Sequence, residues 1–208
     1  MATDYTGAGF GAELPSPSML LRAFREPITD PPNGSPHSRS RDHEVLETAH
    51  ELALCHERRH RAHAAAHDTD TAAEVAEHSR LLEAIDERRL LLVNRINDWV
   101  AANIPHRSGA SLHTETLGAV IDRMASKWVA AQQALGVPVP DAPRSKSTDG
   151  RMRRRTGPHL GEGRNGDAAR HAVDSEAHLQ WYRLAELADG YKDLITEVAQ
   201  HRRRLPVW

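Results

Sequence analysis

The stretch from Thr71 to Asn103 restricts the fold more than any other part of the chain. Its inward positions recur at alternating steps of three and four, which is the period of an α-helix with one buried face. Pro105 and Gly109 follow and are expected to end the helix. Because a long helix must cover its apolar stripe with other elements, further helices are expected around it. The inward positions are Val75, His78, Leu82, Ile85, Arg89, Leu92, Ile96 and Trp99.

The same periodicity predicts three more long helices, over residues 42–67, 114–135 and 174–203, and a short one over 16–26. Aromatic residues make up only 4% of the chain, and the apolar set is mostly Leu, Ala, Val and Ile, which suits helix packing. The predicted fold class is all-α: four long helices in a bundle, with a short N-terminal helix and no sheet. The end of the chain, Leu205 to Trp208, is expected to fold back onto the bundle.

Two segments are too rich in Pro, Gly and Ser, or too poor in large apolar residues, to form regular structure. The first lies within residues 1–41, predicted to hold the short helix and a flexible linker. The second, residues 136–173, is predicted to be a disordered, mobile basic loop between the third and fourth long helices. Residues 42–208 are expected to form one helical bundle domain.

Charge and cysteine content limit the partners and the compartment. A formal net charge of −2 gives no general attraction to nucleic acid or to a membrane surface. Cys55 is the single cysteine, so neither an intrachain disulfide nor a cysteine-based zinc site can form, and a reducing cytoplasm is expected. Residues 1–13 lack the features of a signal peptide, and no apolar run is long enough to span a bilayer. We expect a soluble, cytoplasmic protein without membrane contact.

Several stretches together resemble a known bacterial family. They are LLEAIDERRLLLVNRINDWV at 81–100, LHTETLGAVIDRM at 112–124 and LAELADGYKDLITEVAQHRRRLPVW at 184–208. With ELALCHERR at 51–59 and ELPSPSMLLRAFREP at 13–27, the chain is similar to the actinobacterial branch of the family called domain of unknown function 4254. The resemblance implies a helical fold, and it implies no activity, because none is established for the family.

Arg89 is the most informative candidate residue, because it falls on the buried stripe between Ile85 and Leu92. A buried guanidinium needs an anionic partner. One interpretation is an ion pair with Asp122 or Glu115 across the helix interface. The other is that Arg89 and Arg123 present forked donors to a carboxylate or phosphate of a small ligand.

The start of the helix at 114–135 holds the candidate catalytic residues His113, Glu115 and Asp122. Titratable groups of both signs lie close together there, and a histidine can exchange protons near neutral pH. The structural alternative is that Thr114 or Thr116 caps the helix while Glu115 favours its positive end. No reaction follows from these residues alone.

Histidines repeat on one face of the helix at 42–67. His56 continues its apolar stripe and joins Arg89 and Arg123 as the candidate ligand-binding set. Two Glu-x-x-His pairs, at 47–50 and 57–60, are reminiscent of di-iron bundles, but those sites take their pairs from different helices. We therefore predict no bound metal and no other cofactor, and leave open whether the histidine face binds metal. The histidines of this face are His56, His60, His63 and His67.

Three functional interpretations remain. The first is an accessory or interaction protein of bacterial metabolism with a protein partner, since no complete catalytic motif is present. The alternative is a small-molecule enzyme or binder with an inter-helix pocket for an anionic ligand, so whether the chain is an enzyme stays open. The third is polyanion contact through the basic loop at 144–164, although nucleic acid is not expected because no aromatic residues there could stack on bases. A closed ion-pair cluster would favour the first interpretation, and an open cavity with unpaired donors the second.

Overall fold

The protein is described from a computed structural model that covers residues 14–27, 43–66, 71–105, 107–136 and 163–206, with only the backbone described for 163–175. Most of these residues are helical, which confirms the predicted all-α class. The helices are α1 (Pro17–Arg25), α2 (His43–Ala66), α3 (Ala72–Asn103), α4 (Leu117–Ala134) and α5 (Gly163–Ala199).

Local signals fix where the helices begin. The Ser16 hydroxyl accepts a hydrogen bond from the Met19 amide, and a proline follows the cap, as expected for the start of α1. A capping box at Thr71 begins α3. At α4 the cap is Thr116, which accepts from the Ala119 amide, so this helix begins later than the predicted residue 114.

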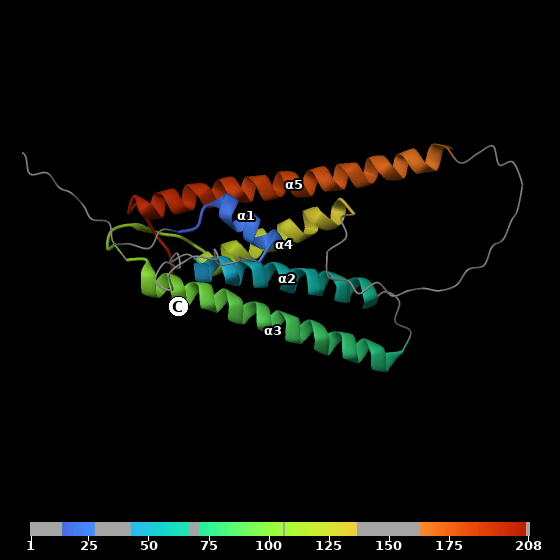
Figure 1. Cartoon of the computed structure of the whole chain (residues 1–208), viewed down its shortest axis with the longest axis horizontal. Coiled ribbons are helices and arrows are strands. Elements are labelled where there is room, and N and C mark those ends of the chain that lie inside the picture. The colour runs from blue at the N-terminus through green and yellow to red at the C-terminus, as the bar shows by residue number, and fades with distance from the viewer. Residues whose placement is uncertain (1–13, 28–42, 67–70, 106, 137–162, 207–208) are drawn as a thin grey trace, which may run out of the picture.

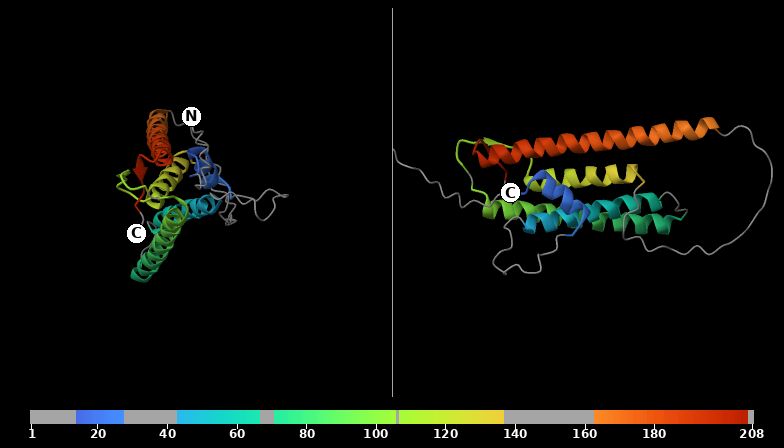
Figure 2. Two further views of the ribbon diagram at one scale, coloured as in Figure 1. Left: turned by 90° about the vertical axis from the view of Figure 1, so that its left-hand side faces the viewer. Right: turned by 45° about the horizontal axis from the view of Figure 1, so that its top comes forward.

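The helices are arranged in layers (Figure 1). α2 and α3 form an antiparallel pair, α4 packs on both of them, and α5 packs on α4. α1 lies against α2, α4 and α5, and Figure 2 shows it beside the stack. Within the described ranges α5 contacts neither α2 nor α3. The expected bundle is therefore an open stack in which α4 separates the α2/α3 pair from α5.

Three features at or near α5 differ from the sequence prediction. The helix begins at Gly163, inside the stretch expected to be loop, while residues 137–162 of that predicted loop lie outside the described residues. It ends at Ala199 instead of residue 203, because His201 takes a positive φ of 56° that breaks the helix. The chain then forms strand β2 (Arg203–Arg204), which pairs in parallel with β1 (Ser111–Leu112). The prediction of no sheet was wrong at this point, because two-residue strands leave no periodic signal.

The core lies where α1, α2, α3 and α4 meet and extends to α5. Tyr191 of α5 is buried and its hydroxyl donates to the Pro15 carbonyl at 2.8 Å, which fastens the segment before α1. Leu205 is also buried, as expected for the end of the chain, whereas 207–208 lie outside the described residues. Val75, predicted to face inward, is 52% exposed, and Leu135, at the end of the helix predicted over 114–135, is 52% exposed as well. The period of a pattern tells which face is apolar, and does not tell how far the neighbouring helices cover it.

One close approach fixes α4 on α3. The Gly118 amide donates to Asn97 Oδ1 at 3.0 Å, and both residues lie in the interior. A Cβ atom at position 118 would lie only 2.4 Å from the Val93 carbonyl oxygen, so no larger side chain fits there. The contact sets the height of α4 along α3 and thereby places Asp122, one turn further on, between the helices. None of the described helices is long and apolar enough to cross a membrane.

Candidate functional site

Five charged or titratable side chains from three helices meet where α2, α3 and α4 pack together. We call this group the ionic cluster. Its centre is Asp122 of α4, whose Oδ1 accepts from His56 Nε2 at 2.9 Å and lies 3.3 Å from Arg89 Nε. The ion pair expected between Arg89 and Asp122 is therefore present. The cluster consists of His56, Arg59, Asp86, Arg89 and Asp122.

A second carboxylate completes the cluster. Asp86 Oδ1 accepts from Arg89 Nη1 at 2.7 Å and from Arg59 Nε at 3.1 Å. Arg89 thus bridges two aspartates that belong to different helices. Two carboxylates neutralise two guanidiniums, so the cluster carries little charge that a ligand could neutralise.

The cluster is partly buried, and the burial is graded. The side chains of His56, Asp122 and Arg89 are 10%, 19% and 26% exposed, whereas Asp86 and Arg59 lie at the rim. Arg89 Nε is buried without a hydrogen-bond acceptor in good geometry, although Asp122 lies at ion-pair distance. Attraction to Asp122 is what compensates for the burial of this guanidinium.

The other predicted site residues lie elsewhere. Arg123 donates from both Nη atoms to the two carboxylate oxygens of Glu115, at 2.9 and 2.6 Å, in an exposed pair. His113 Nδ1 lies 2.8 Å from the Glu115 backbone oxygen. The structure thus joins Asp122 to His56 and Arg89, while it pairs Glu115 with Arg123. The catalytic and ligand-binding roles of these residues stay predictions.

His113 lines a polar cavity of about 290 Å³ between the strand pair and α5. The wall includes Asp193 and Glu197 of α5 and Arg203 of β2. A hydrogen bond from the Arg203 side chain lowers the pKa of Glu197 below its ordinary value. The cavity therefore presents both signs of charge and is not selective for an anion.

A larger groove lies between the outer parts of α2 and α3. We call it the α2/α3 groove; its volume is about 510 Å³, and none of the described residues that line it belongs to α4. Its floor is apolar and its rim carries arginines. The lining residues are Cys55, Arg58, Arg61, Ala62, Ala65, His78, Leu81, Ala84, Ile85 and Arg88.

The groove and the ionic cluster share the same helix pair. Consecutive residues of a helix are about 100° apart around its axis, so they face different surroundings. Arg58 lines the groove while Arg59 belongs to the cluster, and Arg88 and Arg89 divide in the same way. The two sites are therefore two faces of one helical unit.

Cys55 lies on the floor of the groove and is buried. Burial raises the pKa of its thiol, an effect that the guanidiniums of Arg58 and Arg88 only partly oppose. A thiol that stays protonated near neutral pH is a poor nucleophile and a poor metal ligand. Cys55 therefore behaves as a small apolar residue of the groove.

The histidine face of α2 does not act as one unit. His56 belongs to the ionic cluster, His60 and His63 are exposed, and position 67 lies outside the described residues. His50 donates from Nδ1 to the Ala23 carbonyl oxygen at 2.8 Å, which ties α2 to α1. In the part of the chain that the structure describes, no three His, Cys, Asp or Glu side chains are grouped closely enough to hold a metal ion.

Two groups of site residues were missed from the sequence. Arg59 lies three residues from the predicted site residue His56, and Asp86 lies three residues from Arg89. This spacing places residues on the same helix face and is a usable signal. The alanines of the groove gave no signal, because their number is ordinary for a helix. Only the packing of α2 on α3 shows that they form an open surface.

The fold and these sites define an all-α protein built on a unit of α2, α3 and α4, with α1 and α5 packed on it. Residues 46–148 match the family described as protein of unknown function (DUF4254). Over this stretch, which holds most of α2 and all of α3 and α4, the chain belongs to that family, so the resemblance to the family is confirmed. The actinobacterial branch stays a prediction. No curated protein and no solved structure matches the chain.

Proposed function

We propose that this protein is an accessory protein that binds another protein through the α2/α3 groove. The observation that supports this most is the contrast between its two faces. The ionic cluster, which holds three of the predicted site residues, is closed by the chain's own aspartates. The groove, by comparison, is open, apolar on its floor and lined by arginines. An uncovered apolar groove with a polar rim is a feature of protein interaction sites.

An enzyme for an anionic substrate is less well supported. Such a site needs donors that are free to bind the substrate, and Arg89 and Arg123 both point at carboxylates of the chain. A ligand would have to displace Asp122 or Glu115 to reach them. Polyanion contact through the basic segment stays a prediction, because residues 144–162 lie outside the described residues.

Capture from native cell extract, with the tagged full-length chain as bait, tests this proposal. Ala65→Trp and Ala84→Trp would fill the groove, since both alanines are exposed on its lining. Ala185→Trp, at an exposed position of α5, is the matched control. We expect the wild type and the control to capture one partner protein with saturable binding. Both groove variants should fail to capture it. Equal capture by all four proteins would contradict the proposal.

A thermal-shift screen of carboxylates and phosphates tests the alternative function, an enzyme or binder for a small anionic molecule. If the ionic cluster is structural, no such compound should raise the melting temperature of the wild type. A compound that raises it by several degrees, and has no effect on Arg89→Gln, would favour the small-molecule function instead.

A second candidate function is supported by the cavity at His113. Histidine, aspartate, glutamate and arginine side chains line it together, a set that suits a small molecule carrying both charges. A zwitterionic compound whose binding, measured by calorimetry, is lost in His113→Gln would support this function. Binding that is unchanged in His113→Gln would exclude this cavity as the site.

A further inference from the structure

We infer that the α2/α3 groove binds an amphipathic helix of a partner protein whose apolar stripe is flanked by acidic residues. This inference rests on the proposed function and specifies its partner. The shape of the groove is the first argument. It extends along two antiparallel helices, from Cys55 to Ala65 on α2 and from Arg88 to His78 on α3. At about 1.5 Å per residue, this length matches about three turns of an incoming helix.

The lining favours close approach by another helix. Ala62, Ala65 and Ala84 are small, and helices approach most closely where their contact residues are small. Leu81, almost half exposed, and Ile85 provide apolar contact beside them. The groove is open along one side and cannot enclose most of a small molecule, as pockets for such ligands do. A helix laid into a groove needs only one of its faces buried.

The charge of the rim determines the kind of helix. Arg58, Arg61 and Arg88 line the groove, and no acidic side chain is among its described lining residues. Arg88 has a carboxylate partner, Glu51, on the neighbouring part of α2. Within the described ranges, no carboxylate lies within ion-pair distance of Arg58, and the only one near Arg61 is Glu57 at 4.0 Å. The rim is therefore complementary to acidic residues.

The protein already contains an internal example of this arrangement. On the neighbouring face of the α2/α3 pair, α4 packs as a third helix and its Asp122 meets Arg89 and His56. An acidic amphipathic helix in the groove would meet Arg58 in the same manner, since Arg58 has no carboxylate within ion-pair distance among the described residues while Arg88 is paired with Glu51. A second copy of the chain suits the groove less well, because two such grooves facing each other would bring identical arginines together.

Fluorescence anisotropy with two synthetic peptides tests the inference. One labelled helical peptide, of about 18 residues, carries leucines at alternating steps of three and four with glutamates beside them; the other has lysine at every glutamate position. The full chain should bind the glutamate peptide at least about 10-fold more tightly than the lysine peptide. Equal affinity for both peptides, or no binding of either, would overturn the inference.

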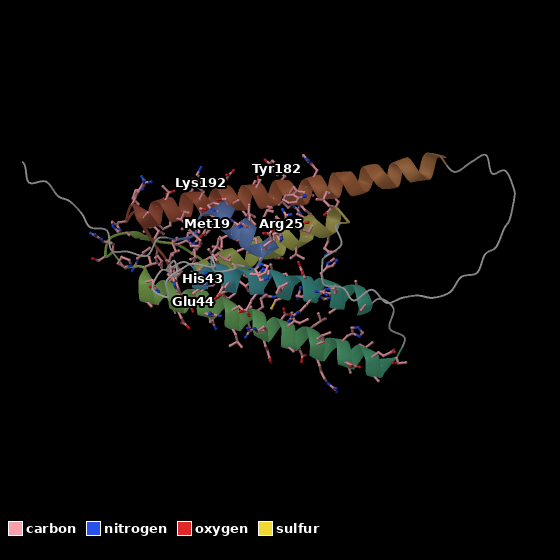
Figure 3. All side chains as sticks on the ribbon, viewed as in Figure 1. Met19, Arg25, His43, Glu44, Tyr182 and Lys192 are labelled. Atoms are coloured by element: carbon pink, nitrogen blue, oxygen red, sulfur yellow. The ribbon has the colours of Figure 1, made fainter. Side chains whose placement is uncertain are left out.

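Reversing the charge of two rim arginines is expected to change which peptide the protein prefers. In the double variant Arg58→Glu/Arg61→Glu the preference should switch to the lysine peptide. The matched control is Arg183→Glu/Lys192→Glu on the exposed surface of α5, which contacts neither α2 nor α3; Figure 3 labels Lys192 there. The control should keep the wild-type preference. A switch that also appears in the control would show that net charge, and not the groove, decides binding.

Failure of this inference can be distinguished from failure of the proposed function. If capture of a native partner is lost in Ala65→Trp while the wild type does not prefer the glutamate peptide, the protein binds a partner of different chemistry. If the peptide preference holds but groove variants capture the partner normally, the proposed function fails. A concentration-dependent dimer that sedimentation shows to be lost in Ala84→Trp would assign the groove to a second copy and overturn the inference.

Discussion

The two faces of the α2/α3 pair differ in how their arginines are neutralised. On the face that α4 covers, Arg59 and Arg89 meet Asp86 and Asp122 within a partly buried cluster. On the groove face, Arg58 has no carboxylate partner among the described residues, although it is the neighbour of Arg59 in sequence. The difference comes from the third helix. α4 brings Asp122 to Arg89, whereas on the groove face Arg88 is paired with Glu51 of α2 and Arg58 stays without a described carboxylate at the rim of an apolar groove.

The two faces are therefore expected to contribute to different properties: the ionic cluster to stability and the groove to partner binding. Residues of the ionic cluster hold three helices together, so their removal should be seen first in the free energy of unfolding. Residues of the groove rim are exposed and contribute little to that free energy, because exposed charges are well solvated. Their removal should be seen first in affinity for a partner.

The largest loss in the free energy of unfolding is expected from a substitution that moves α4 away from the α2/α3 pair. Gly118→Ala would place a Cβ atom 2.4 Å from the backbone oxygen of Val93, which cannot move without shifting α3. We expect a loss of about 3 kcal/mol or more in the free energy of unfolding, measured by urea denaturation.

A second glycine provides the control for this variant. Gly190, in the interior of α5, has open space around its Cα, so Gly190→Ala should be neutral or stabilising by about 0.5 to 1 kcal/mol. A similar loss of unfolding free energy in both variants would show that the close contact between Gly118 and Val93 is not what makes position 118 intolerant of a side chain.

The second largest loss of stability is expected when Asp122, the carboxylate that α4 supplies, is removed. Asp122→Ala leaves Arg89 and His56 without this carboxylate in a site where Arg89 is about one quarter exposed. We expect a loss of about 2 kcal/mol, less than the cost of breaking a fully buried pair because solvent screens part of the interaction. In a double-mutant cycle with Arg89→Ala, the coupling should exceed about 0.5 kcal/mol. Coupling near zero would mean that Asp122 and Arg89 do not interact in solution.

A smaller effect is expected at the floor of the groove. Burial raises the pKa of Cys55 above its ordinary value of 9.0, so at pH 8 less thiolate is present than in an exposed cysteine. Alkylation by iodoacetamide should therefore be slower than for a free cysteine and should accelerate as the pH rises beyond 9. The glutamate peptide should slow it further by covering the groove. Fast alkylation at pH 8 that the peptide leaves unchanged would argue against a buried thiol in a binding groove.

Much of the fold could be predicted from the sequence, because long amphipathic helices leave a periodic signal. The apolar stripe over 71–103 and the short helix expected over 16–26 both correspond to elements that the structure contains, α3 and α1. The strand pair at Ser111 and Arg203 could not be predicted, since it depends on a contact between distant parts of the chain. The same is true of the layered arrangement, because periodicity does not tell which helices touch.

The candidate site was predictable only in part. The position of Arg89 on an apolar stripe indicated an acidic partner, and Asp122 is that partner. The grouping of His113 with Asp122 was not found, because His113 precedes α4 and lines the cavity beside α5, whereas Asp122 lies within α4 and faces α2 and α3. The groove could not be predicted, since an uncovered face has the same sequence pattern as a covered one.

The most direct test of the account measures stability and binding for two single variants in parallel, Arg58→Ala and Arg89→Ala. We predict that Arg89→Ala lowers the free energy of unfolding by about 1 to 3 kcal/mol and leaves affinity for the glutamate peptide within about twofold of the wild type. Arg58→Ala should keep its stability within about 0.5 kcal/mol of the wild type and lose affinity for the peptide. The account is contradicted if Arg58→Ala destabilises the protein as much as Arg89→Ala, or if both variants lose the peptide equally.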